Sequence, residues 1–197
     1  MTTNTSFSAG NWIVANCVGA DHLHPESVDV VSNFTLMWNL FEGIACQNHA
    51  NIKTFESLAE KIAQHDPHLE GVDDAISFWT FRYWTGSNFR DRFNDLRFRP
   101  NDRRDHVEAV LRKEKTDSAS QLLAVMIIVY RLRNNLFHGL KTVDMLNDQA
   151  ANLDMACRAL AAVLEASGNY PVHRQVEPNE RFNQRFERGR SQAGPST

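Results

Sequence analysis

The stretch SASQLLAVMIIVYRLRNNLF, residues 118–137, decides the fold. Apolar side chains at positions 122–132 point in almost every direction around a helix, which is typical of a helix buried on more than one side. Residues 116–118, Thr-Asp-Ser, have the side chains that cap helix N-termini, and Gly139 stands where a helix commonly ends. The stretch therefore predicts a long central helix.

The rest of the chain also shows helical rather than strand periodicity. Apolar residues recur at three- and four-residue spacing, with no strand alternation and no internal repeat. The sequence thus predicts an all-α fold with additional short helices. Further helices are expected over 30–47, from an N-cap at Thr54 toward Pro67, over 72–85, in a short piece before Pro100, over 102–115 and over 144–166.

Length and composition limit the class of protein. The chain has 197 residues, 42% hydrophobic and 23% charged, which fits one globular domain with a tail. We expect an N-terminal extension at 1–29, a helical domain at 30–170 and an Arg-rich disordered tail at 171–197. The longest apolar run, 122–130, is about half of the roughly 20 residues that a bilayer requires, so no membrane partner is expected. Three cysteines without a CxxC pair and no basic leader predict a reduced, cytoplasmic protein.

Charge is unevenly distributed along the chain. Residues 1–81 carry two basic and ten acidic side chains, whereas residues 82–115 carry ten basic and six acidic ones. Arginine outnumbers lysine 16 to 5, and its planar fork suits phosphate recognition. The basic stretch is compatible with a polyanion-binding surface and equally with solvated helix faces laced with ion pairs.

The end of the central helix carries an unusual polar cluster. Arg131, Arg133, Asn134 and Asn135 interrupt the apolar run, and His138 follows. Such a cluster at a helix C-terminus can simply complement the helix dipole. Burying these groups without partners would be costly, so they should be solvated, paired or functional.

Arg133-Asn134-Asn135-Leu136-Phe137-His138 resembles the Arg-x4–6-His motif of HEPN domains, which are small all-α domains of many bacterial defence and toxin ribonucleases. The segment 34–42, FTLMWNLFE, is similar to the first-helix pattern of several HEPN families, and the match spans roughly residues 30–166. The resemblance implies a HEPN-like helical bundle that forms a two-fold symmetric dimer. On an ideal helix Arg133 and His138 lie about 140° apart. They can meet at one ligand only if the helix loosens at its end or if a second copy contributes, and the second option would place the site across a two-fold axis.

The resemblance implies a metal-independent endoribonuclease without a cofactor. His138 would be the general base on the ribose 2′-OH or the acid toward the 5′-oxygen, Arg133 would bind the scissile phosphate, and Asn134 would orient one of them. The products would carry 2′,3′-cyclic phosphate and 5′-hydroxyl ends. Leu140 stands where HEPN toxins silenced by nucleotide addition carry a tyrosine, so restraint by an antitoxin, an activating partner or an occluded site is expected instead.

The RNA backbone would contact the basic stretch and the region of the motif. Phe89, Phe93 and Phe98 are available for base stacking, or else they are core aromatics beside solvated arginines. The candidate RNA-binding residues are Arg90, Arg92, Arg97, Arg99, Arg103, Arg104, Arg131 and Lys141.

Two other interpretations remain open. A non-catalytic HEPN-like module for dimerisation or for RNA or nucleotide binding would keep the same fold and motif. A plain helical interaction protein would carry the motif by accident. Cleavage activity separates the first from the enzyme, and the oligomeric state separates the second.

Overall fold

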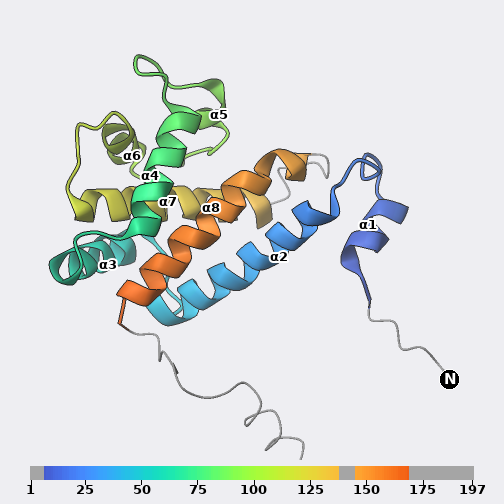
Figure 1. The fold of residues 1–197 in the computed structure, drawn as a ribbon, viewed down its shortest axis with the longest axis horizontal. Helices are drawn as coiled ribbons and strands as arrows, with labels where there is room; N and C mark the ends of the chain where they lie inside the picture. Colours follow the sequence, from blue (N-terminus) through green and yellow to red (C-terminus); the bar gives the residue numbers. More distant parts are fainter. Residues whose placement is uncertain (1–6, 138–144, 169–197) are drawn as a thin grey trace, which may run out of the picture.

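The protein is described by a computed structural model that covers residues 7–137 and 145–168 (Figure 1). Within these residues the chain is helical, and its one β-type feature is an isolated bridge between Trp84 and Phe89, which confirms the all-α prediction. The elements are α1 (Ala9–Asn16), α2 (Pro25–Leu40), the π-helical turn η1 (Phe41–Ala45), α3 (Ile52–His65), α4 (Glu70–Tyr83), α5 (Asp91–Asn94), α6 (Arg104–Leu111), α7 (Ser118–Phe137) and α8 (Met145–Ala166).

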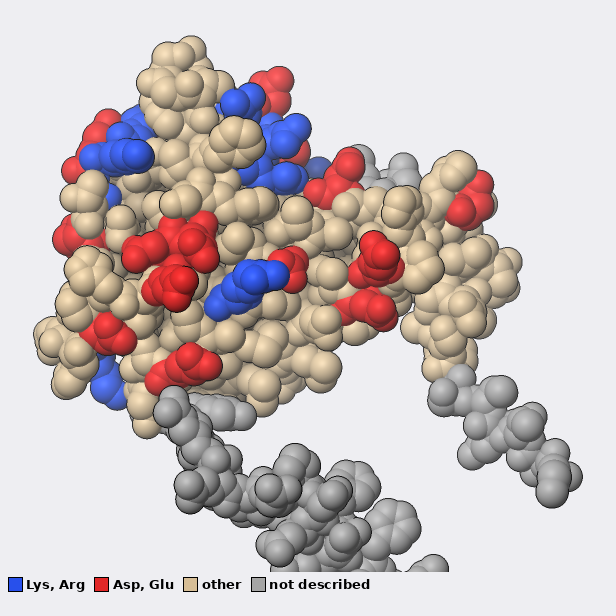
Figure 2. All heavy atoms as spheres, viewed as in Figure 1, with Lys and Arg blue, Asp and Glu red and all other residues tan. Residues whose placement is uncertain are grey.

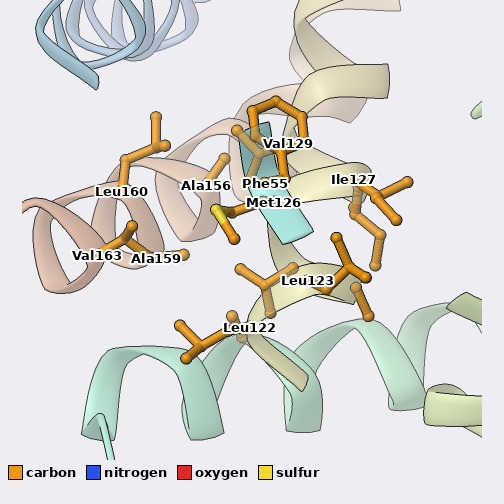
Figure 3. Packing of buried hydrophobic residues seen from close by; sticks show 14 of the residues in the cluster. Phe55, Leu122, Leu123, Met126, Ile127, Val129, Ala156, Ala159, Leu160 and Val163 are labelled. Carbon is orange, nitrogen blue, oxygen red and sulfur yellow. The ribbon is translucent and has the colours of Figure 1, made fainter. Parts of the chain in front are cut away.

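α7 is the central helix, and its bounds match the predicted helix over 118–137. Every residue from Leu122 to Val129 is buried, as expected for a helix that is apolar on nearly all sides. Figure 3 shows Leu122, Leu123 and Met126 in one cluster with residues of α8 and with Phe55 of α3. Despite this apolar character, no helix in the described ranges is long and apolar enough to cross a membrane.

α2 and α8 run side by side, and α4 packs on α8 and α7 (Figure 1). α8 begins within one residue of its predicted start, whereas α2 begins five residues before the predicted start at 30. The earlier start has a local cause, because Pro25 occupies the first helical turn, where its missing N–H costs nothing. α2 therefore extends into the predicted N-terminal extension, which also contains α1.

Two predicted helix starts are shifted by local hydrogen bonds and backbone conformation. Asn51, not Thr54, caps α3, because its side chain accepts from the Thr54 backbone N–H at 3.1 Å. α6 spans eight residues rather than the predicted 102–115. Arg103 and Lys113 adopt left-handed backbone conformations with φ of 54° and 62°, which are incompatible with a continuing right-handed helix.

Charge is segregated over the surface. Figure 2 shows Lys and Arg side chains gathered at the end of the molecule that carries α5 and α6, while Asp and Glu predominate on the face formed by α4, α8 and α2. The basic stretch of the sequence therefore forms one end of the structure. The segment 95–102 belongs to this stretch and contacts α7.

Candidate active site at the end of α7

The last two turns of α7 carry two Arg–Asn pairs that face different parts of the molecule. Arg131 and Asn135 are four residues apart and so share a helix face, while Arg133 lies about 200° from Arg131. The first pair contacts the segment 95–102 that precedes α6. Arg133 instead contacts side chains of α2 and η1, with Asn134 bound to it.

Arg131 is a buried structural residue, so the prediction that it contacts RNA is wrong. Its side chain is 3% exposed, and its Nε donates to the Leu96 carbonyl at 3.0 Å. Nη2 donates to the Arg97 carbonyl at 2.6 Å, and Nη1 lies 3.0 Å from Asp102 Oδ2. Burial lowers the pKa of the Arg131 guanidinium, and the Asp102 carboxylate opposes that shift. A buried cation needs such partners, and at 3% exposure the side chain is not accessible to an RNA phosphate.

Asn135 strengthens the same attachment. Its Nδ2 donates to the carbonyls of Asp95 at 2.8 Å and Leu96 at 3.1 Å. Arg131 and Asn135 together donate to the three consecutive carbonyls of residues 95–97. These carbonyls lie beyond the end of α5 and accept no hydrogen bond within a helix. This face of α7 therefore fixes the chain that leads into the basic end of the molecule.

Arg133 contacts two aromatic rings on the other face of α7. Its guanidinium carbon is 5.5 Å from the centroid of the Trp38 ring and 5.2 Å from that of the Phe137 ring. Both distances are within the range of cation–π attraction. The side chain remains 29% exposed, so its plane is oriented by the rings while part of it meets solvent.

Glu42 is the acidic neighbour of Arg133. Trp38 Nε1 donates to Glu42 Oε2 at 2.8 Å, and Arg133 Nη2 lies 4.0 Å from the same oxygen. Glu42 belongs to η1, and π turns often occur at functional sites. Trp38 and Glu42 were not among the predicted site residues, although their i,i+4 spacing on a helix pointed to one common face.

Asn134 completes this group. Its Oδ1 accepts from Arg133 Nη1 at 3.2 Å, and the residue is 5% exposed. Within the described ranges, Asn134 Nδ2 and Arg133 Nε are buried without a hydrogen-bond partner. Two unsatisfied buried donors in one helical turn are expensive for a folded protein, and such groups are common at functional sites.

Two predicted site residues, His138 and Lys141, lie outside the described residues. The site geometry therefore consists of Arg133 and Asn134 from α7 with Trp38 and Glu42 from α2 and η1. The part assigned to His138 stays a prediction.

The other arginines predicted to bind RNA fall into two groups. Arg103 pairs with Glu56, and Arg104 pairs with Glu108 at 2.7 Å. The second group is exposed, and among the described residues no ion pair joins its members to a carboxylate; its members are Arg90, Arg92, Arg97 and Arg99. These four cations are free to meet an anion.

The aromatic residues between α4 and α6 are mostly structural. Phe93 is fully buried, so the prediction that it stacks on bases is wrong, because its ring packs against Tyr83, Phe89 and Phe98. Phe89 and Phe98 are half-buried at the edge of the core. The core interpretation therefore applies to Phe93 and in part to the other two.

In the part of the chain that the structure describes, no three His, Cys, Asp or Glu side chains are grouped so that they could hold a metal ion. Comparisons with models of known protein families, with curated proteins and with solved structures found no match. The site is therefore interpreted from its own residues.

Proposed function

We propose that the chain is a metal-independent endoribonuclease of the HEPN type, from a bacterial defence or toxin–antitoxin system, with a composite site at the interface of a homodimer. One observation carries the proposal: Arg133 of the RNNLFH motif contacts both Trp38 and Glu42. These are the residues that make the segment 34–42 similar to the first helix of HEPN families. Two sequence segments about 95 residues apart, each singled out for its resemblance, thus meet at one place.

Arg133 has the properties of a phosphate-binding residue. The rings of Trp38 and Phe137 both contact its guanidinium and restrict its position. The edge of a guanidinium donates a fork of hydrogen bonds to phosphate oxygens, and such bonds strengthen as charge develops on them. At 4.0 Å and partly exposed, Glu42 is a loose partner that a phosphate can replace.

The chemistry needs a proton acceptor and a proton donor near neutral pH, which histidine supplies. The ribose 2′-oxygen attacks phosphorus and loses its proton to a base, and the bond from phosphorus to the 5′-oxygen breaks. That oxygen takes a proton and leaves as the 5′-hydroxyl, while the phosphate becomes a 2′,3′-cyclic diester. His138 of either copy is the residue proposed for these transfers, with Asn134 orienting it or the phosphate.

A second candidate is a non-catalytic HEPN-like module that binds RNA or a nucleotide or mediates dimerisation. The Glu42 contact favours this alternative, because a carboxylate beside Arg133 reduces the positive charge offered to a phosphate. In such a module the same group of residues would serve packing or ligand contact rather than catalysis.

The test is cleavage of RNA by the purified full chain in excess EDTA, with product ends analysed and mass measured by light scattering. Arg133→Ala and His138→Ala should each lower the cleavage rate by about 10²–10⁴-fold, the usual contribution of such groups. The products of the wild-type dimer should carry 2′,3′-cyclic phosphate.

Matched controls come from residues far from the motif. Arg158 on α8 and His65 on α3 are exposed, and their alanine variants should cleave like the wild type. Cleavage that survives both motif substitutions would refute the mechanism. RNA binding by a wild-type dimer that cleaves no RNA would support the non-catalytic module.

A further inference from the structure

α6 holds two arginines in a fixed arrangement through one carboxylate. Arg104 Nε donates to Glu108 Oε1 at 2.7 Å, and Arg112 Nη2 donates to Glu108 Oε2 at 3.0 Å. The three residues are spaced four apart and so lie along one side of the helix. Glu108 thereby orients two guanidinium groups and leaves the three side chains with a combined charge of +1.

A row of aromatic rings lies beside these arginines. Trp84 and Phe89 are 4.8 Å apart between centroids, and Phe89 stacks on Phe93 at 4.3 Å with an interplanar angle of 21°. Phe98 continues the row at 5.3 Å from Phe93. The rings belong to the segment between α4 and α6, where the bridge from Trp84 to Phe89 closes the loop that places them together.

Each guanidinium covers two of these rings. The Arg112 carbon lies 5.6 Å from the Trp84 centroid and 5.1 Å from that of Phe89. The Arg104 carbon lies 5.0 Å from the centroid of Phe93 and 5.9 Å from that of Phe98. We call Arg104, Glu108 and Arg112, with the rings beneath them, the arginine–aromatic platform.

The platform is accessible from solvent. The Arg104 side chain is 45% exposed and that of Arg112 is 36% exposed, although one face of each covers aromatic rings. The exposed area therefore belongs to the outer faces and edges of the guanidinium groups. Because Glu108 and the rings already order both side chains, a ligand that stacks on them does not have to immobilise them.

We propose that the platform binds single-stranded RNA by stacking unpaired bases on the outer faces of Arg104 and Arg112. Planar guanidinium groups accept bases in this way, whatever the base. The exposed arginines without an ion pair named above lie in α5 and in the segments on either side of it, and they supply charge for the phosphates. The choice of RNA rests on the proposed function, whereas the stacking site itself rests on the platform.

The geometry distinguishes this ligand from other polyanions. In a duplex the base faces are already stacked on one another and are not offered to a protein. An acidic peptide offers charge without a planar ring, and Glu108 has already offset half of the charge of the two arginines. Stacking, rather than net charge, should therefore dominate the contribution of Arg104 and Arg112.

The test is fluorescence anisotropy with a labelled ten-nucleotide single strand, using the full chain with His138→Ala so that the RNA stays intact. Arg104→Lys and Arg112→Lys keep the charge and remove the planar face, so each should weaken binding by about tenfold. Arg158→Lys is the matched control, because Arg158 pairs with Asp154 four residues away but covers no ring within the described structure, and it should bind like the parent. Circular dichroism and thermal unfolding of each variant report whether the fold is kept.

Three competitors sharpen the result: a duplex of the same sequence, a strand of equal length without bases, and a polyglutamate of equal charge. Each should compete at least tenfold less well than the single strand. Equal binding by the lysine variants in a folded chain, equal competition by any of the three, or no RNA binding by the parent would overturn the inference. Binding is measured without cleavage. The result therefore tests the stacking site even if the protein proves not to be a ribonuclease.

Discussion

Two faces of one helix end differ in what their polar groups contact and in how deeply they are buried. On one face Arg131 and Asn135 donate to three backbone carbonyls, and Arg131 pairs with a carboxylate in the protein interior. On the other, Arg133 keeps a loose contact with Glu42 and is 29% exposed. Among the described residues each face also has two buried polar atoms without a hydrogen bond, namely Arg131 Nη1 and Asn135 Oδ1 on the first and Arg133 Nε and Asn134 Nδ2 on the second. The same two residue types occur within one and a half turns of α7 in both arrangements.

This contrast separates an arginine that attaches two segments in the interior from one that lies partly exposed beside aromatic rings. A buried cation that pairs with a carboxylate and donates to backbone carbonyls contributes by attaching one segment to another, and its loss leaves a buried carboxylate without an opposite charge. An arginine that is partly exposed and oriented mainly by aromatic rings contributes little to stability. Stability measurements on paired variants therefore separate the two faces without any assay of activity.

The largest expected effect is that of Arg131→Ala. Removing this cation takes the only opposite charge from the buried Asp102 carboxylate among the described ion pairs and the side-chain donor from the Arg97 carbonyl, which should lower the free energy of unfolding by about 3–5 kcal/mol. Arg133→Ala should lower it by less than about 1 kcal/mol. Urea denaturation of both variants, followed by circular dichroism, measures the difference, and equal losses would contradict the division into two faces.

A smaller effect separates the two asparagines. Asn135→Ala removes the donor to the Asp95 and Leu96 carbonyls and should cost about 1–3 kcal/mol. Asn134→Ala removes an amide whose Nδ2 has no partner in the described structure, so its cost should be well below that of Asn135→Ala. The same denaturation experiment ranks them, and the reverse order would mean that Asn134 has a structural role.

The structural side of α7 should also respond to pH through His106 of α6. Burial lowers the pKa of His106, and although its Nε2 donates to the Ser120 carbonyl at 3.0 Å, Lys115 Nζ lies 3.4 Å from the other ring nitrogen. The unfolded chain takes up this proton near the ordinary pKa of 6.5, and the folded chain only at lower pH.

Stability should therefore fall as the pH drops below about 6.5, and level off once the folded state is protonated as well. This effect is smaller than the loss of the buried ion pair. Thermal unfolding between pH 7.5 and 5 measures it, and His106→Gln should reduce the slope. An unchanged slope in that variant would assign the pH dependence to other groups.

The smallest effect is expected for Glu42→Gln. The amide oxygen can still accept from Trp38 Nε1, and the ion pair that is lost is long and partly exposed. The free energy of unfolding should change by less than about 1 kcal/mol. A loss above 2 kcal/mol would make Glu42 and Arg133 a structural pair like Asp102 and Arg131, and would erase the contrast between the faces.

The sequence predicts helix positions well where a single local pattern of apolar residues dominates. The apolar run at 118–137 and the spacing at 144–166 predicted α7 and α8 almost to the residue, because few other structures bury such patterns. The polar cluster at the end of α7 stands out in the sequence because it interrupts this apolar run. The spacing shows that Arg131 and Arg133 lie on different faces of the helix. It does not show which of these faces packs against another segment, so the sequence does not distinguish their roles.

The sorting comes from tertiary contacts that local patterns do not encode. Arg131 became structural because the segment 95–102 passes over its face with free carbonyls and Asp102. Phe93 likewise became a core residue because three other rings surround it. Neither outcome follows from spacing, because each depends on chain segments distant in sequence.

The π turn after α2 has a consequence for insertions and deletions. A π turn holds one residue more than an α-helical turn, and here the Cys46 N–H bonds to the Phe41 carbonyl at 3.1 Å, five residues back. Deleting one residue within 41–45 would convert this wide turn into an ordinary α-helical turn, so the chain beyond it should keep nearly its present orientation. The same deletion within the regular part of α2 would instead rotate every later side chain of that helix by about 100°. The π turn is therefore the place in this helix where the loss of one residue disturbs the packing against its neighbours least.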